Sequence, residues 1–329
     1  MSAMKVFAFD YASGGGDGSS RGRGAGASGA ALPDALKHHG RIMLGALLAD
    51  LVKLPEVELI TISDPSLFKR RFNACLQAAD AVWPLAPEAG GVLERLSRQV
   101  LRHKRILLGS KPAALRVAAS KLRTARVLAR AGVAVAATYT AEQSLPDGSG
   151  AWVVKPDDGA GCLDTRIFAD AGSALAWIAA SGVAGYVLQP FIPGKLGSLS
   201  LLCCNGEAQV LSCNEQRVVV RDNQFHFLGT TVNSLTDCAG RFARLAQSVA
   251  AAIPGLWGHV GVDFVNAEHG VVVLEVNPRM TTSYCGLHAS IGCNPAALVL
   301  DLLGPPGGAP RARAKPVAVS VDVAAFASA

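Results

Sequence analysis

One segment gathers acidic and amide side chains in a pattern that can bind a cation. Residues 258–279 read GHVGVDFV-NAEHG-VVVLEVNPR, two apolar and β-branched arms around a polar turn that ends in glycine, which is typical of a β-hairpin. Side chains alternate between the faces of a strand, so Glu275 and Asn277 share one face. With the turn centred in NAEHG, Asp263 falls opposite Glu275, and their Cβ atoms are expected roughly 5 Å apart.

The facing carboxylates of this hairpin predict a cation between them, because like charges that face each other destabilise a sheet. Asp263, Glu275 and Asn277 form an oxygen-only set, which suits a hard cation. Mg²⁺ in particular takes one or two carboxylates together with substrate phosphates. A surface hairpin with its polar face in water is the alternative. We favour the metal–phosphate site, with these three side chains as metal ligands.

Length and composition narrow the classes of protein. A chain of 329 residues is expected to form two or three domains. Half of its residues are hydrophobic and 17% are charged, yet no segment has the run of about 18–20 apolar residues that a membrane span requires. The N-terminus also lacks the apolar core of a signal peptide. We therefore expect a globular protein with no membrane association.

Cysteine usage and charge indicate the compartment and the ligands. The eight cysteines are scattered and show no CxxC spacing, which favours reduced thiols in a cytoplasmic protein over a zinc site. The net charge of +6 fits anionic ligands. No basic run with interleaved aromatic residues is present, so we expect no nucleic-acid partner.

The first 110 residues alternate strand and helix patterns, which predicts a parallel sheet with helices on its faces. The strands are expected at 5–10, 57–62, 79–87 and 105–110, and the helices at 33–54, 65–79 and 88–103. Residues 12–31 hold eight glycines without apolar periodicity. That segment fits a flexible loop better than a phosphate cradle, because it matches neither GxGxxG nor GxxxxGK[ST].

The middle of the chain offers phosphate-binding elements. Residues 150–168 predict a hairpin with Lys155 at the end of its first strand and a glycine-bearing tip. Gly159 and Gly161 would let backbone N–H groups approach phosphates, although an ordinary β-turn explains the same letters. A helix that starts at Lys121 is expected to end at Gly132.

Two further segments complete the pattern. YVLQPFIPG (186–194) predicts a strand that continues into an extended stretch, whose unpaired backbone groups could contact a purine edge beside Gln189. An ordinary domain connector is the alternative. Residues 198–220 then predict a long hairpin, with Asn214 and Arg217 near its end. Residues 317–326 read as a final strand.

Five motifs in order give the chain a family resemblance: SKLRT, VVKPDDGAG, QPFIPG, GVDFV and LEVNPR. Their order and spacing resemble those of the ATP-grasp carboxylate–amine ligases. The resemblance implies an α/β fold with α+β lobes, in which a Rossmann-like pre-ATP-grasp domain (1–112) precedes a small ATP-grasp lobe (113–194). A C-terminal lobe with the metal site (195–329) follows. It also implies ATP and two Mg²⁺ ions, with Mn²⁺ as an alternative.

The resemblance assigns roles to individual residues. Contacts to the transferred phosphoryl group fall to Arg279, Arg217 and Lys155. The nucleotide contacts fall to two lysines, the glycine turn, the extended segment and one serine: Lys121, Lys155, Asp157, Gly159, Ala160, Gly161, Cys162, Gln189, Pro190, Phe191, Ile192 and Ser198. The family's ribose-binding Glu is absent, since Gly197 or Ser198 is in its place, and Gln189 stands where a Glu often contacts adenine.

Three segments carry a narrower resemblance: NPRMTTSYCGL, KPDDGAGC and the early GGG…LPDALKHHGRIMLGALLADL. In the last of these, His39 stands where the family commonly has a Glu. The three segments are similar to the tyramine–glutamate ligases of methanofuran-type, one-carbon cofactor biosynthesis. That family implies amide formation between tyramine and the γ-carboxylate of L-glutamate, through an acyl phosphate. The substrate contacts would come from five residues: Asn214, Thr281, Thr282, Ser283 and Tyr284.

Alternatives remain open at this point. Another ATP-grasp ligase could act on a different amine, and a nucleotide-binding regulator without catalysis is a further candidate. The segment 281–284 could instead be a helix N-cap followed by packing residues. The sequence leaves the oligomeric state open, with a homodimer as one candidate.

Overall fold

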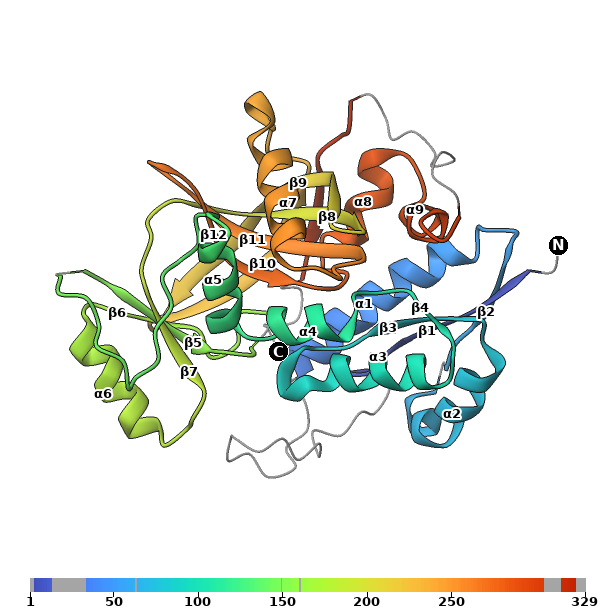
Figure 1. Cartoon of the computed structure of the whole chain (residues 1–329), viewed down its shortest axis with the longest axis horizontal. Helices are drawn as coiled ribbons and strands as arrows, with labels where there is room; N and C mark the ends of the chain where they lie inside the picture. Colours follow the sequence, from blue (N-terminus) through green and yellow to red (C-terminus); the bar gives the residue numbers. More distant parts are fainter. Residues whose placement is uncertain are drawn as a thin grey trace.

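The structure is a computed structural model that describes residues 3–13, 34–62, 64–148, 150–159, 161–304 and 315–323. The glycine-rich segment 14–33 and Ala160 lie outside the described residues. Within the described part, the strands form one sheet of four and one of nine (Figure 1). None of the helices in those ranges combines the length and apolarity needed to cross a bilayer.

The N-terminal part is a parallel sheet with helices on both faces. Its strand order is β2-β1-β3-β4, and every pairing is parallel. The strands are β1 (Met4–Asp10), β2 (Val57–Ile60), β3 (Ala81–Leu85) and β4 (Ile106–Leu107). The helices are α1 (Asp34–Leu51), α2 (Phe68–Ala78) and α3 (Val92–Arg102). This is the architecture expected from the alternating pattern.

Strand β1 shows why helices cover both faces of this sheet. Its residues from Val6 to Asp10 are all buried, as expected for a parallel strand between two helical layers. Alternation places Val6 in the cluster that contains Leu47 of α1. Phe7 and Phe9 belong to the opposite cluster, where Phe9 packs edge to face on Phe72 of α2.

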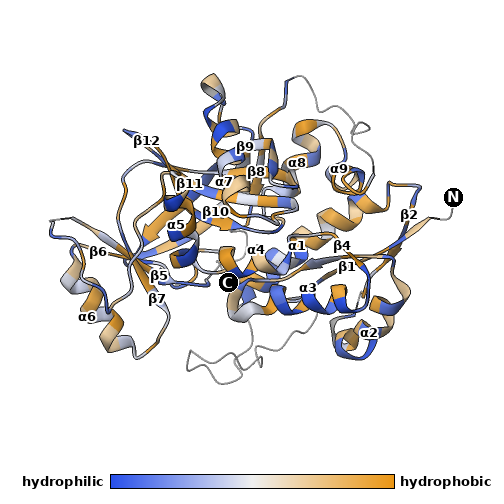
Figure 2. Ribbon diagram, in the orientation of Figure 1, coloured by the Kyte–Doolittle hydropathy of each residue, from blue (hydrophilic) through white to orange (hydrophobic). Residues whose placement is uncertain are grey.

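Helix α1 lies between the two halves of the molecule. One side packs on the N-terminal sheet, and the other meets α8 (Tyr284–Ile291) and α9 (Pro295–Asp301), as Figure 1 shows. Leu47 and Leu51 share a fully buried cluster with Leu287 and Ile291 of α8. Helix α3 instead alternates hydrophobic and hydrophilic stretches along its length (Figure 2), because only one side covers the sheet. The α1–α8 contact fixes how the N-terminal half meets the site described below.

The larger sheet runs through the rest of the chain in the order β12-β11-β8-β9-β10-β6-β5-β7, with β13 paired to β10. All of its named pairings are antiparallel. Its strands are β5 (Trp152–Pro156), β6 (Arg166–Phe168), β7 (Tyr186–Pro190), β8 (Lys195–Cys204), β9 (Glu207–Arg221), β10 (Gln224–Val232), β11 (Gly258–Ala267), β12 (Gly270–Asn277) and β13 (Val319–Asp322). The accompanying helices are α4 (Pro112–Ala118), α5 (Lys121–Arg130), α6 (Ala171–Ser181) and α7 (Arg241–Ala252).

The sheet narrows sharply where its small lobe begins. Strands β5, β6 and β7 with α6 form that lobe, whose own core surrounds Trp152 and Leu188. Only one pair of residues, Gln224 and Arg166, is in register between β10 and β6. The backbone N–H of Ile167 adds a 2.8 Å bond to the carbonyl of Asn223. The small lobe is thus joined to the main sheet through a short junction.

Candidate active site

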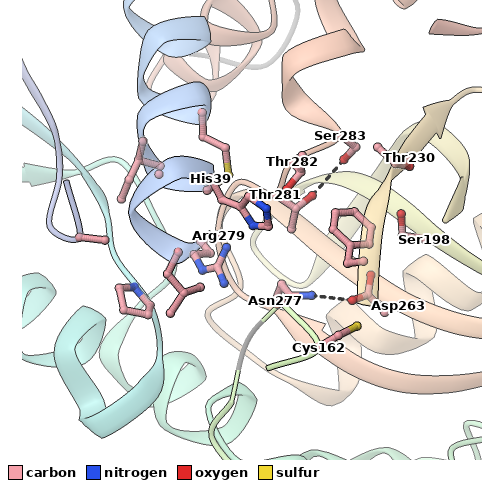
Figure 3. A pocket seen from close by; sticks show the side chains of 18 of the residues that line it. His39, Cys162, Ser198, Thr230, Asp263, Asn277, Arg279, Thr281, Thr282 and Ser283 are labelled. Atoms are coloured by element: carbon pink, nitrogen blue, oxygen red, sulfur yellow. Dashed lines mark hydrogen bonds between the residues drawn. The ribbon is translucent and has the colours of Figure 1, made fainter. Parts of the chain in front are cut away.

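The acidic hairpin forms as the alternation predicts. Asp263 on β11 is in register with Glu275 on β12, and the register shifts just after Asp263. Gln216 Nε2 donates a 2.9 Å hydrogen bond to Asp263 Oδ1. Asn277 Nδ2 donates to Asp263 Oδ2 at 3.1 Å, as the dashed line in Figure 3 marks. Two carboxylates and two amides therefore share one face of the sheet.

The electrostatics of this pair suit a bound cation. Burial and the facing Glu275 raise the pKa of Asp263 well above its ordinary value. Burial alone would also raise the pKa of Glu275, but the ammonium groups of Lys121 and Lys155 hold it at about 2. Lys121 Nζ lies 3.2 Å from Glu275 Oε2. A divalent cation would relieve the repulsion that keeps one of the two carboxyls from ionising.

The donor set also indicates which cation. Within the described ranges, no group of three His, Cys, Asp or Glu side chains is placed to hold a metal by itself. Asp263, Glu275 and Asn277 supply two carboxylates and an amide oxygen, so further ligands must come from water or substrate. Mg²⁺ is commonly bound in this way, with one or two carboxylates and the phosphates of a nucleotide. These residues fit Mg²⁺ delivered with a phosphate ligand.

Helix α5 ties the glycine turn to this site. Lys121 Nζ donates a 2.7 Å bond to the carbonyl of Gly159, and the backbone N–H of Leu122 donates to Asp157 Oδ1 at 2.9 Å. The α5 N-terminus is capped by Ser120, whose side chain accepts from the N–H of Arg123. Asp157 therefore acts as an anchor of the turn. Ala160, predicted to contact the nucleotide, lies outside the described residues.

A cavity of about 400 Å³ opens between the small lobe and the end of the large sheet. Its walls are mostly apolar and include the two lysines and the acidic pair. Lys155 is buried here, and burial lowers its pKa to about 8, partly offset by Glu275. The predicted nucleotide contacts that line this cavity are Lys121, Lys155, Gly159, Gly161, Cys162, Gln189, Pro190, Phe191 and Ile192. Its size and lining suit a nucleotide.

A second cavity, of about 130 Å³, lies on the other side of the acidic pair. Its walls come from α1, the ends of β1 and β3, and the large sheet; Figure 3 shows the side chains that point into it. Both cavities are lined by Asp263, Glu275, Gln216, Gly161 and Cys162. The acidic pair therefore stands where the two cavities meet.

Arg279, two residues beyond the end of β12, reaches the N-terminal half of the chain. Arg279 Nη2 donates to Glu88 Oε2 at 2.9 Å, and Arg279 Nε lies 2.8 Å from Glu88 Oε1. Both side chains are largely buried. Burial opposes the charge of Arg279, but the Glu88 carboxylate keeps the arginine pKa above its ordinary value. Arg279 lines the second cavity as a fixed, charged donor.

A network of hydroxyl groups lies at the wall of the second cavity. Ser283 Oγ lies 2.9 Å from Thr281 Oγ1 and 2.7 Å from Ser200 Oγ. Asn214 Nδ2 donates to Ser200 Oγ at 3.2 Å and to Ser198 Oγ at 3.3 Å. The network holds the hydroxyls in place for a polar ligand. Thr281, Thr282 and Ser283, three of the five predicted substrate contacts, line the cavity together with Ser198.

Besides Asp157, which lines neither cavity, four predicted contacts lie elsewhere. Arg217 lines neither cavity, because its guanidinium bonds Asp322 Oδ1 at 2.5 Å and the carbonyl of Val321 on β13. Tyr284 is buried, and its hydroxyl donates to Asp50 Oδ2 at 3.0 Å.

The other two corrections concern polar residues of β8 and β9. Asn214 is fully buried and lines neither cavity. Ser198, predicted to contact the nucleotide, lines the second cavity instead, since it is in register with Asp263.

The structure adds residues that the sequence interpretation missed. Gln216 lines both cavities, although its neighbour Arg217 was predicted. Strand alternation is the signal that finds it, because Gln216 shares a face with Asn214 and Arg217 does not. Glu88 and Asp10 come from the N-terminal half, where nothing in the local pattern marked them.

A glycine pair in α1 tests how closely this helix must approach the cavity. An added Cβ at Gly40 would overlap the carboxylate of Asp10, a buried side chain that also accepts the backbone N–H of Ser13 at 2.6 Å. Gly40→Ala is therefore expected to destabilise the protein by about 1–3 kcal/mol, despite its better helix propensity. Gly45→Ala meets no atom within 4 Å and should stabilise by about 0.5–1 kcal/mol.

Urea unfolding of the two variants, compared with the unaltered protein, measures this difference. Equal stability of Gly40→Ala and Gly45→Ala would show that α1 does not press on Asp10.

Comparisons with known proteins agree with this geometry. The ATP-grasp domain family matches residues 118–283, and the pre ATP-grasp 3 domain family matches residues 42–115. A protein named tyramine–L-glutamate ligase from Methanocaldococcus fervens is 25% identical over 241 residues, 72% of each chain. Another of that name, from Methanocaldococcus jannaschii, is 33% identical over 102 residues, and the match spans 31% of this chain and 32% of that protein.

Solved structures show the same fold. A crystal structure assigned to the ATP-grasp superfamily, from Archaeoglobus fulgidus, superposes with a TM-score of 0.68 at 22% identity, over 91% of this chain and 88% of that one. The first family match alone covers half of the chain. The chain therefore belongs to the ATP-grasp family, with a pre-ATP-grasp domain ahead of the ATP-grasp domain.

Proposed function

We propose that this protein joins the γ-carboxylate of L-glutamate to the amine of tyramine at the expense of ATP. The observation that carries the proposal is the position of Asp263 and Glu275 between two cavities. A nucleotide in the larger cavity would place its terminal phosphate at the acidic pair, and a carboxylate in the smaller cavity would face it. Such an arrangement serves phosphoryl transfer from ATP to a carboxylate.

The reaction needs activation because a carboxylate is a poor electrophile. Transfer of the γ-phosphoryl group would give an acyl phosphate, which the amine then attacks with loss of phosphate. Lys121 and Lys155 lie on the nucleotide side and Arg279 on the acceptor side of the acidic pair. Preorganised cations of this kind stabilise the charge that develops during phosphoryl transfer.

Magnesium fits the acidic pair. Asp263, Glu275 and Asn277 would hold it, and when bound it supplies neutralisation of phosphate charge. The chain's own contribution is to position these ligands: Gln216 and Asn277 both donate to Asp263 and fix its carboxylate.

Exclusion of water is the role we assign to the glycine turn. Gly161 and Cys162 line both cavities, and Asp157 and Gly159 are bonded to the start of α5. An acyl phosphate hydrolyses when water reaches it, so a turn seated over the junction protects the intermediate. The proposed reaction requires no side chain that forms a covalent bond to the substrate.

The substrate assignment rests on the names of the two Methanocaldococcus relatives and on the lining of the second cavity. Arg279, Thr281 and Thr282 offer a cation and hydroxyls for an amino acid such as glutamate. Leu36 and Phe227 line the same cavity and offer apolar surface for an aromatic amine. The place of this reaction would be methanofuran-type cofactor biosynthesis.

The test is phosphate release with Mg·ATP and L-glutamate, with and without tyramine, combined with mass spectrometry of the product. We expect tyramine-dependent turnover and a product mass of glutamate plus tyramine less water. Phosphate release that needs glutamate but does not respond to tyramine would support a ligase for another amine. Tight ATP binding without turnover on any amine would overturn the proposal in favour of a regulatory nucleotide-binding protein.

A further inference from the structure

The proposed function leaves a proton to be removed, and this inference rests on that function. An alkyl amine such as tyramine is protonated at neutral pH and must lose a proton before its nitrogen can attack an acyl phosphate. A base within the acceptor cavity would accept that proton. Such a base must be a side chain of the cavity wall that is neutral, within reach of the amine and not engaged in another hydrogen bond.

His39 on α1 meets these requirements. It lines the second cavity, and Figure 3 shows its imidazole pointing from the helix into that cavity. The ring lies edge to face with Phe227, with centroids 6.2 Å apart. Within the described part of the chain, its recorded contacts are ring contacts with Phe227 and His38, and no hydrogen bond engages either ring nitrogen. The imidazole is thus free to bond a substrate.

The surroundings of His39 favour its neutral form. Burial lowers its pKa below the ordinary value of 6.5, and the positive charges of His38 and Arg279 act in the same direction. The charged or titratable groups that share its cavity are Asp10, Cys162, Arg279, Asp263 and Glu275. Arg279 is ion-paired with Glu88, which does not line the cavity. A neutral imidazole can accept a proton at the pH where most enzymes work.

We propose that His39 is the catalytic base that accepts the proton of the attacking amine. Tyramine is an ammonium ion at neutral pH, and its first proton passes to a ring nitrogen of His39, which frees the nitrogen lone pair to form the C–N bond. The C–O bond to phosphate then breaks, its electron pair leaves with the phosphate, and the second N–H proton goes to that departing phosphate. The imidazolium releases its proton to solvent, so the products are the amide, hydrogen phosphate and one proton.

Other candidates in the cavity are less suited to this task. The Asp10 carboxylate is buried and accepts the backbone N–H of Ser13. Burial raises the pKa of the Cys162 thiol to about 12, so its thiolate is scarce at neutral pH. Lys155 lines the nucleotide cavity and not the acceptor cavity. Among the described residues that line the acceptor cavity, His39 is the one imidazole.

Comparing two nucleophiles, tyramine and hydroxylamine, distinguishes a catalytic role of His39 from a structural one. Hydroxylamine is already unprotonated at neutral pH and traps an acyl phosphate as a hydroxamate without a base. The His39→Asn variant should therefore form hydroxamate from ATP and glutamate at a rate within twofold of the unaltered enzyme. Its turnover with tyramine should fall by about 10²–10⁴-fold, the usual contribution of a general base. His38→Asn, the matched change one residue earlier on α1, should keep both rates.

The pH profile gives a second readout. In the unaltered enzyme, kcat with tyramine should rise with pH through a pKa below 6.5, because deprotonated His39 is the active form. This limb should disappear from the residual activity of His39→Asn. The hydroxamate rate should instead follow the protonation of hydroxylamine itself, in the same way in both proteins.

Each outcome decides the question. A parallel fall of hydroxamate and amide formation would make His39 structural, and unchanged amide formation would exclude it as the base. Retention of the acidic limb in His39→Asn would transfer the role to Asp10. If the unaltered enzyme forms no hydroxamate with ATP and glutamate, the proposed function fails first, independently of His39.

Discussion

Asp263→Asn is expected to reduce ATP-dependent turnover by about 10³-fold, because a bound divalent cation contributes several kcal/mol of charge stabilisation. The same change should leave the fold intact. Asparagine removes one of two facing carboxyls, and the Asp263 carboxyl already has a raised pKa in the absence of metal. The amide can still accept the bond from Gln216, and rotation of the Asn277 amide preserves the second bond.

Phosphate release at saturating Mg·ATP and thermal unfolding without metal measure the two halves of this prediction. Asp222→Asn, in the exposed turn between β9 and β10, is the control for the same change of charge. The thermal midpoint of Asp263→Asn should lie within a few degrees of the unaltered protein. Turnover within tenfold of that protein would place the metal site elsewhere.

Loss of the Glu88 carboxylate is expected to have the largest effect on stability. Glu88→Ala would leave the buried Arg279 guanidinium without its partner, which costs about 3–5 kcal/mol when a buried ion pair is broken. Arg279→Met should be costly for the same reason, since it strands the carboxylate. The double variant should lose less free energy of unfolding than the sum of the losses in the two single variants, because it buries no unpaired charge.

Urea unfolding of the three variants completes this cycle. The exposed pair of Arg116 and Glu94 provides the contrast, and Arg116→Ala should leave the unfolding midpoint unchanged. Additive losses in the cycle would mean that Glu88 and Arg279 do not stabilise each other across the two halves of the chain.

Local rules predicted the acidic hairpin well. Its turn fixes the register, and the period of two then determines which side chains share a face. This is why Asp263, Glu275 and Asn277 were brought together correctly from the sequence. The helix expected to start at Lys121 is confirmed as Lys121–Arg130, with Gly132 at a φ of +75° just beyond it. Capping and alternation depend only on neighbours in the chain.

Long-range contacts were beyond such rules. Glu88 and Arg279 are 191 residues apart, so no local pattern links them. Helices α4, α7 and α9 were missed, and two of them, α4 and α9, are single short segments of seven residues. The position of Arg217 was wrong for a different reason, because its partner strand β13 was expected without a place in the sheet. The positions of these residues depend on contacts between segments that are far apart in the sequence.

The narrow junction between β10 and β6 has a consequence for motion. A ladder that is one residue pair in register, with few flanking backbone bonds, resists bending far less than the long β8–β9 ladder does. The small lobe has its own core around Trp152, so it can turn as one body without losing internal contacts. Amide protons of β6 at the junction should therefore exchange with solvent much faster than those of β8. The larger cavity would widen and narrow with that movement, while the bonds of Asp157 and Gly159 to α5 limit how far the lobe can turn.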